Sequence, residues 1–131
     1  MLIKALLKSL KKLSISLRLK FMEKEKLILK GIAASSGIAE GLVRVVEGVK
    51  DISSFNDGDI LVAEITEPSM VIMMNKAAAI VTNKGGMTSH PAIVSRELGI
   101  PCVVATKTAT RDLENGMKIR VDGAKGEVYL I

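Results

Sequence analysis

The only histidine of the chain, His90, lies in a short segment rich in glycine and hydroxyl residues. Gly85 and Gly86 precede it, and Thr88 and Ser89 stand immediately before it. Paired glycines allow a positive φ and bring backbone N–H groups close to an anion. A neutral imidazole acts as a nucleophile through one ring nitrogen. The segment is therefore suited to phosphoryl transfer, with His90 as acceptor and the glycines and hydroxyls positioning the phosphoryl oxygens.

The residue that follows the histidine predicts the start of a helix. Pro91 suits the first helical position, where its missing N–H costs nothing, and either Ser89 or His90 then occupies the cap. The N-terminal end of a helix carries free N–H donors and partial positive charge, which favour an anion such as phosphate. A lone histidine at a helix start also serves as a cap or a packing residue. The residues by themselves leave both interpretations open.

Other kinds of chemistry find little support in the sequence. One histidine and one isolated cysteine, Cys102, are too few ligands for a zinc site, so we expect no metal. Asp57 and Asp59 flank a glycine and are typical turn formers, and Glu64 has no catalytic spacing to them. Neither a nucleotide P-loop nor a dinucleotide fingerprint is present. We therefore expect this domain to bind no cofactor of its own.

The reactive segment lies between a predicted buried strand and a predicted helix, within a mixed α/β pattern. Runs of apolar and β-branched residues separated by turn residues predict strands, and three- to four-residue apolar spacing after a proline predicts helices. The strands are predicted at 27–34, 41–46, 60–63, 77–82 and 102–105, with a closing hairpin at 116–123 and 126–131, and the helices at 69–76 and 91–98. The methionines at 70–74 are expected to fill the core.

Composition and charge narrow the class of protein further. The 131 residues are 48% hydrophobic but only 2% aromatic, so the core must be aliphatic. The net charge is +5, but residues 1–26 hold eight Lys and Arg against two Glu. The remaining residues hold eleven basic and twelve acidic side chains. We therefore expect no nucleic-acid partner for the body of the chain.

Residues 2–20 have the pattern of a basic amphipathic helix, which predicts an extension at 1–26 and a domain at 27–131. Such a helix binds anionic membrane or an acidic partner, but it also packs on its own domain or is dispensable. Met22 offers a second start. Lysines interrupt the apolar run, so we expect no signal peptide. The lone Cys102 is expected to be buried and inert, which suits the cytoplasm.

The stretch from residue 85 to 101, GGMTSHPAIVSRELGIP, resembles the signature of the mobile phosphohistidine domain of phosphoenolpyruvate-utilising enzymes. These include pyruvate phosphate dikinase, phosphoenolpyruvate synthase and enzyme I of the sugar phosphotransferase system. A looser similarity runs through 31–41 and 58–62 to the end, covering roughly 27–131. The resemblance implies a swivelling β/β/α fold with a phosphorylated histidine at His90. In the dikinase and synthase branches it also implies a regulatory phosphorylation at Thr88.

The same resemblance implies a phosphoryl carrier that is incomplete without partner chains. ATP-grasp nucleotide-binding and phosphoenolpyruvate/pyruvate-barrel chains would supply the donor and acceptor sites, with Mg²⁺ on those partners. A barrel alone needs about 250 residues, more than this sequence holds. Pro91 departs from the small residue that many members have there, although it still suits a helix start. The alternative is a non-catalytic regulatory or binding module that keeps the fold.

Overall fold

The computed structural model describes Ser14 and residues 25–131. The predicted helix at 2–20 lies outside these residues, apart from Ser14. The described strands are β1 (Lys26–Lys30), β2 (Ile32–Ser35), β3 (Ile38–Val45), β4 (Ile60–Ala63), β5 (Ala79–Thr82), β6 (Cys102–Val104), β7 (Lys118–Asp122) and β8 (Glu127–Leu130). The helices are α3 (Val71–Met74), α4 (His90–Leu98) and α5 (Ala109–Asp112), with 3-10 helices η1 (Val49–Ser54) and η2 (Pro68–Met70). None of the described helices is long and apolar enough to cross a membrane.

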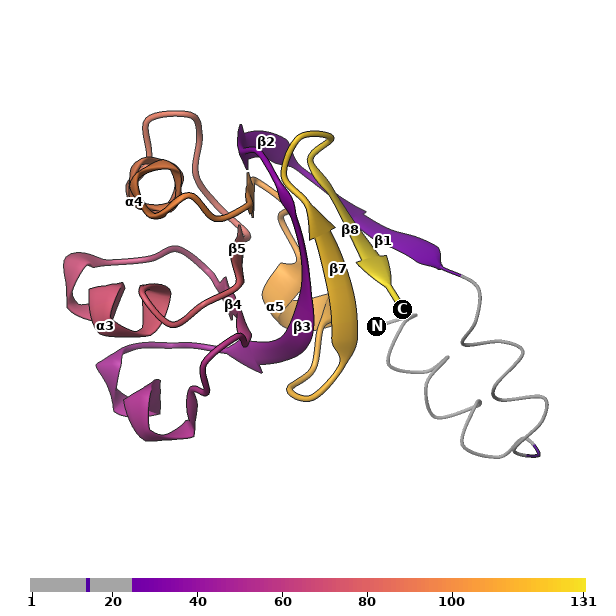
Figure 1. The fold of residues 1–131 in the computed structure, drawn as a ribbon, viewed down its shortest axis with the longest axis horizontal. Coiled ribbons are helices and arrows are strands. Elements are labelled where there is room, and N and C mark those ends of the chain that lie inside the picture. Colours follow the sequence, from indigo (N-terminus) through magenta and orange to yellow (C-terminus); the bar gives the residue numbers. More distant parts are fainter. Residues whose placement is uncertain (1–13, 15–24) are drawn as a thin grey trace.

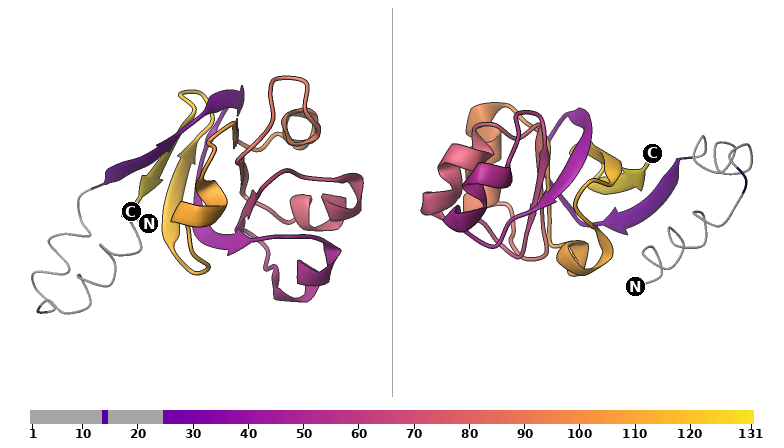
Figure 2. Two further views of the ribbon diagram at one scale, coloured as in Figure 1. Left: turned by 180° about the vertical axis from the view of Figure 1, so that it is seen from behind. Right: turned by 90° about the horizontal axis from the view of Figure 1, so that it is seen from below.

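The eight strands follow the order β1-β8-β7-β3-β4-β5-β6-β2. Strands β3, β4, β5 and β6 pair with one another in parallel. The pairs β1–β8, β7–β8, β3–β7 and β2–β6 are antiparallel. The long strand β3 belongs to both an antiparallel half (β1, β8, β7 and β3) and a parallel half (β3, β4, β5 and β6). Strand β2 lies antiparallel to β6 at the outer edge of the parallel half. Figures 1 and 2 show the two halves facing one another, with α3 and α4 outside the parallel half.

The stretch predicted as one strand at 27–34 forms two strands, which corrects that expectation. Gly31 separates β1 from β2, and these strands end up at opposite edges of the strand order. The backbone N–H of Gly31 donates to the carbonyl of Gly126 at 2.9 Å. A Cβ on Gly31 would lie 2.2 Å from the carbonyl oxygen of Val104. The chain can therefore turn there only because residue 31 has no side chain.

Two apolar cores lie on opposite faces of the parallel strands, which gives a β/β/α order of layers. Val62 packs in the core between the two halves, together with Ile119 and Val128. Its neighbour Leu61 packs in the other core, beneath the helices. Successive residues of a strand face opposite sides, so a strand buried on both sides reads as a continuous apolar run. The mixed α/β fold predicted from the sequence is therefore the one observed.

The helical segments differ from the predicted ones mainly in length. The segment predicted at 69–76 is a 3-10 turn followed by the single turn of α3, and its Met70, Met73 and Met74 are buried core residues, as expected. The sequence pattern did not reveal η1 or α5, which are too short to show a helical period. Cys102 is fully buried, and burial raises the pKa of its thiol to about 11.

Candidate functional site

His90 is the first residue of α4, at the end of the loop that follows β5. Ser89 occupies the cap position, and Pro91 follows within the first helical turn. The Ser89 hydroxyl does not cap the helix, because it donates to the carbonyl of Gly86 at 2.7 Å. The Ser89 backbone N–H donates to the same carbonyl at 3.2 Å. Ser89 therefore closes the glycine loop, and His90 stands half-buried at the helix N-terminus.

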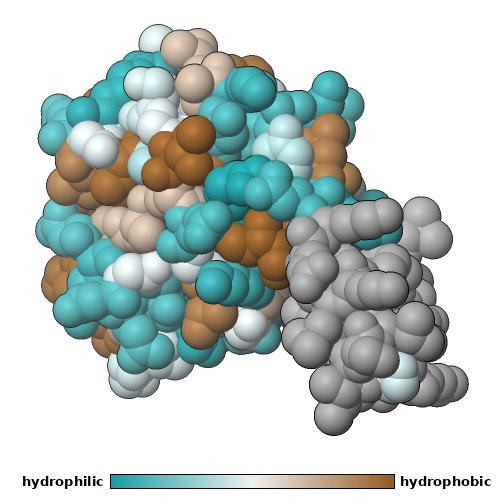
Figure 3. Space-filling view, turned by 45° about the vertical axis from the view of Figure 1, so that its right-hand side comes forward, coloured by the Kyte–Doolittle hydropathy of each residue, from teal (hydrophilic) through white to brown (hydrophobic). Residues whose placement is uncertain are grey.

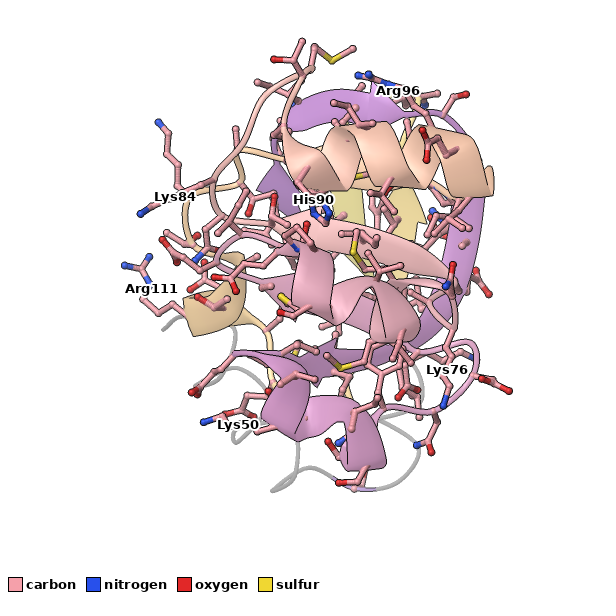
Figure 4. The ribbon with its side chains drawn as sticks, turned by 90° about the vertical axis from the view of Figure 1, so that its left-hand side faces the viewer. Lys50, Lys76, Lys84, His90, Arg96 and Arg111 are labelled. Atoms are coloured by element: carbon pink, nitrogen blue, oxygen red, sulfur yellow. The ribbon has the colours of Figure 1, made fainter. Side chains whose placement is uncertain are left out.

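The sequence did not indicate the nearest partner of His90, which is Thr66. Its Oγ1 lies 2.8 Å from Nδ1 of the imidazole. Thr66 follows β4 and is only 4% exposed, so its hydroxyl has little access to water. Figure 4 shows His90 on the side of the molecule that carries the helices, between α4 and α3. With Nδ1 engaged by Thr66, Nε2 is the ring nitrogen whose protonation decides whether His90 can react.

The hydrogen bond between Thr66 and His90 can run in either direction, with different consequences. If the hydroxyl donates to Nδ1, the neutral ring carries its proton on Nε2 and has no lone pair there. If Nδ1–H donates to Oγ1, the lone pair is on Nε2 and the ring can attack an electrophile. The position of Thr66 therefore bears directly on whether His90 is a nucleophile.

The two glycines of the loop differ in whether their positions could accept a side chain. Gly85 has φ +125°, and a Cβ there would lie 2.9 Å from Oγ of Ser89 and 3.3 Å from Cβ of Val104. Gly86 has no heavy atom within 4 Å of a Cβ position. Gly85 is thus required for the shape of the loop, while Gly86 leaves open space beside the helix start. Thr88 lies in the adjoining turn and is exposed.

A second polar cluster ties together the chain segments that carry Thr66 and His90. The Asn83 side-chain N–H groups donate to the Glu64 carboxylate at 2.5 Å and to Oγ1 of Thr110 at 2.7 Å. Its Oδ1 accepts from the Thr110 backbone N–H at 3.1 Å. Lys84 Nζ lies 3.3 Å from the other Glu64 oxygen. The hydrogen bond from Asn83, together with Lys84, lowers the pKa of the Glu64 carboxyl.

An open depression of about 530 Å³ adjoins the Thr66 segment. Its lining includes the residues on either side of Thr66 but not His90: Val45, Val46, Glu47, Glu64, Ile65, Glu67 and Thr110. Within the part of the chain that the structure describes, no three acidic, histidine or cysteine side chains gather as metal ligands would. The helix N-terminus and Thr66 lie directly beside His90.

Comparison with known proteins places this site in a family. The profile of the PEP-utilising enzyme mobile domain matches residues 55–126, which include the glycine loop, His90 and Thr66. The chain belongs to this family. The family assignment confirms the resemblance carried by residues 85–101, and it agrees with the observed mixed fold.

Relatives of this mobile domain are much longer than the chain. A probable phosphoenolpyruvate synthase of Archaeoglobus fulgidus is 59% identical over 104 residues, 79% of this chain and 14% of that protein. The phosphoenolpyruvate synthase of Pyrococcus furiosus is 56% identical over 108 residues, 82% of this chain and 13% of that protein. The chain thus spans about a seventh of the curated relatives it matches.

Solved structures share the fold of the mobile domain. A solution structure of an Enzyme I protein matches with a TM-score of 0.54 and 32% identity, over 61% of this chain and 33% of that one. Aconitase X of Thermococcus kodakaraensis matches with a TM-score of 0.59 and 23% identity, over 82% of this chain and 98% of that one. The second similarity is one of fold alone.

Proposed function

We propose that this domain is a phosphoryl carrier and that Nε2 of His90 holds the phosphoryl group. The observation that carries the proposal is the contact between Thr66 and Nδ1 at a helix N-terminus. We propose that Nδ1–H donates to Oγ1 of Thr66, so that Nε2 holds the lone pair. Membership of the mobile-domain family and similarity to phosphoenolpyruvate synthases support it.

Each transfer step is a displacement at phosphorus. The Nε2 lone pair forms a P–N bond while the bond from phosphorus to the donor oxygen breaks, and that oxygen leaves with the electron pair. Nδ1 keeps its proton and donates it in a hydrogen bond to Thr66. In the return step an acceptor oxygen attacks phosphorus, and the P–N electron pair goes back to Nε2. Free N–H groups at the start of α4, with Gly85, Gly86, Thr88 and Ser89, would surround the phosphoryl oxygens.

Donor and acceptor would belong to other domains, because this chain corresponds to about a seventh of its relatives. We propose an ATP-grasp nucleotide-binding domain and a phosphoenolpyruvate/pyruvate barrel as partners, with Mg²⁺ held by them. The mobile domain would carry the phosphoryl group between the two, in the cytoplasm.

Thr88 is the proposed site of regulation by phosphorylation. Its side chain is exposed in the turn before the helix, where a modifying enzyme can reach it. A phosphate there would add about two negative charges close to His90 and would repel an incoming phosphoryl donor.

The experiment is phosphoryl labelling of the purified chain in an extract of the source organism, with labelled ATP and labelled phosphoenolpyruvate in separate reactions. We expect acid-labile, alkali-stable label on the chain, none on His90→Ala, and slower labelling of Thr66→Val. Lys125→Ala is the matched control, since Lys125 is exposed in the β7–β8 turn and belongs to neither α4 nor the loop before it. Label that persists in His90→Ala would overturn the proposal. Absence of label with both donors, in an extract shown to form phosphoenolpyruvate, would favour the regulatory module.

A further inference from the structure

We propose that Asn83 is a positioning residue that selects the reactive nitrogen of His90, an inference that rests on the proposed carrier function. Asn83 does not contact the imidazole. It links the two chain segments that bring Thr66 and His90 together. The side chains of Glu64, Asn83 and Thr110 form one hydrogen-bonded group, which we call the Asn83 network.

The network lies where two parallel strands end. In the register of β4 and β5, Ala63 pairs with Thr82, so Glu64 and Asn83 are the next residues of the two strands. The ladder continues for two further bonds, from Asn83 N–H to the Ala63 carbonyl at 3.1 Å and from Lys84 N–H to the Glu64 carbonyl at 3.0 Å. Beyond these bonds one segment leads to Thr66 and the other to the glycine loop. The network is thus the side-chain link at the point where the two segments separate.

Every polar group of the Asn83 amide is engaged, so its orientation is fixed. Thr110 N–H can only donate, and therefore it faces Oδ1. The two amide hydrogens then point to the Glu64 carboxylate and to Oγ1 of Thr110. Asn83 is 7% exposed, whereas the Glu64 side chain is 55% exposed, so the bonds to Thr110 are the ones most sheltered from water. A buried and saturated amide of this kind defines one local arrangement of the three segments it joins.

The consequence concerns the tautomer of His90. Which ring nitrogen carries the proton is set by the hydrogen bond that the other nitrogen makes. That bond depends on the 2.8 Å distance between Thr66 and Nδ1, which spans the two segments. Removing Asn83 leaves the Glu64 side chain without its amide donor and the Thr110 N–H without its acceptor. The two segments then shift relative to one another, the bond to Thr66 weakens, and the proton moves to Nε2 in part of the population.

The test uses the fact that the chain has a single histidine. A chain made with ¹⁵N-histidine, and carrying no histidine tag, gives one Nδ1 and one Nε2 resonance, and their shifts report the tautomer at a pH where the ring is neutral. The same samples are treated with phosphoramidate, a small donor that needs no partner domain. The ring attacks its phosphorus, ammonia leaves, and mass spectrometry follows the gain of a phosphoryl group.

We expect the intact chain to hold the Nδ1–H tautomer. In Asn83→Ala the signal should shift toward Nε2–H, and phosphoryl uptake should fall about tenfold or more. Asn75→Ala, at an exposed asparagine after α3, is the matched control and should change neither readout. Circular dichroism of each variant separates these effects from loss of fold.

A charge swap keeps the test decisive if Asn83→Ala fails to fold. Asn83→Asp places a second carboxylate against Glu64 and should impair both readouts. Adding Glu64→Gln to that variant supplies an amide donor to the new carboxylate at position 83, and should restore the tautomer and most of the rate. The inference is overturned if folded Asn83→Ala keeps the tautomer and rate of the intact chain, or if the folded double variant recovers neither. The tautomer is measured without any partner, so failure of carrier activity in an extract would not be mistaken for failure of this inference.

Discussion

The antiparallel and parallel halves of the sheet use buried polar groups differently. In the antiparallel half, Asp122 is buried, and its carboxylate accepts N–H groups from the β7–β8 turn that it begins. At the ends of the parallel strands, Thr66, Asn83 and Thr106 are buried and bond to residues distant in the sequence. Asp122 thus closes its own turn, whereas the polar groups after the carboxyl ends of the parallel strands hold separate loops together.

The two halves also differ in where non-glycine residues adopt a positive φ. Among the described residues, the two non-glycine residues with positive φ are Ala105 and Lys107, and both follow β6. Lys107 N–H donates to the Asn83 carbonyl, so this strained segment is tied to the Asn83 network. On the outward side of the antiparallel half, Figure 3 shows apolar patches interrupted by polar residues, and Ile38 of β3 is 65% exposed. The antiparallel half is therefore the scaffold, and strain and polar links gather at the site beside the parallel half.

The largest expected effect on stability comes from a substitution in the antiparallel half. In Gly123→Ala, the new Cβ would lie 1.9 Å from the carbonyl oxygen of Ser35. Backbone must move to accept it, so we expect the free energy of unfolding to fall by about 4 kcal/mol or more. Gly48→Ala is the control, because a Cβ there meets nothing within 4 Å and the backbone is extended. Urea denaturation measures both, and similar midpoints for the two variants would show that the scaffold tolerates a side chain at residue 123.

The next largest effect is a pH dependence of the unfolding free energy, which comes from a thiol in the parallel half. Burial raises the pKa of the Cys102 thiol from 9.0 to about 11. The folded state therefore holds a proton that the unfolded state loses first, so the stability is fully present below pH 9.0 and falls as the pH rises to about 11. The loss should approach about 3 kcal/mol.

Urea denaturation at a series of alkaline pH values gives the slope of the unfolding free energy against pH. Cys102→Ala is the reference for the contribution of all other groups. Equal slopes for the two proteins would show that the thiol titrates alike in both states.

A smaller effect is expected in the glycine loop. Gly85→Ala forces a side chain into a positive φ and against Ser89, which should cost about 1–3 kcal/mol of stability and slow the phosphorylation of His90. Gly86→Ala should change stability by less than about 1 kcal/mol. Thermal unfolding measures the stability of both variants, and phosphoryl uptake from phosphoramidate measures the rate at which His90 is phosphorylated. If Gly86→Ala proves the more damaging, the contacts of Gly85 do not determine the shape of the loop.

The residues around His90 were predictable where local chemistry decides the structure. The glycine pair, the proline and the apolar strand before them define a strand–loop–helix unit within one short stretch, and α4 begins one residue earlier than predicted. Ser89 was one of two candidates for the cap, and the structure selects it. The predicted roles of Gly85, Gly86, Thr88 and Ser89 toward a phosphoryl group remain predictions.

The partners of His90 from other segments were not predictable in the same way. Thr66 lies 24 residues away in the sequence and has no pattern of its own. One signal was available, because the carboxyl ends of neighbouring parallel strands meet at one edge, and polar residues directly after β4 and β5 are therefore candidates for a site. The division at Gly31 depended on the Val104 carbonyl, a contact that local propensity cannot reveal.

A carrier must release the phosphoryl group from His90 again, and this release can be measured. The chain is phosphorylated with phosphoramidate that carries labelled phosphorus and is then freed of the reagent. It is mixed with an extract of the source organism and unlabelled pyruvate. We predict that label disappears from the chain and appears in an organic phosphate, and that denatured labelled chain transfers none. Label that stays on His90 until it is lost to water as inorganic phosphate would contradict a carrier function.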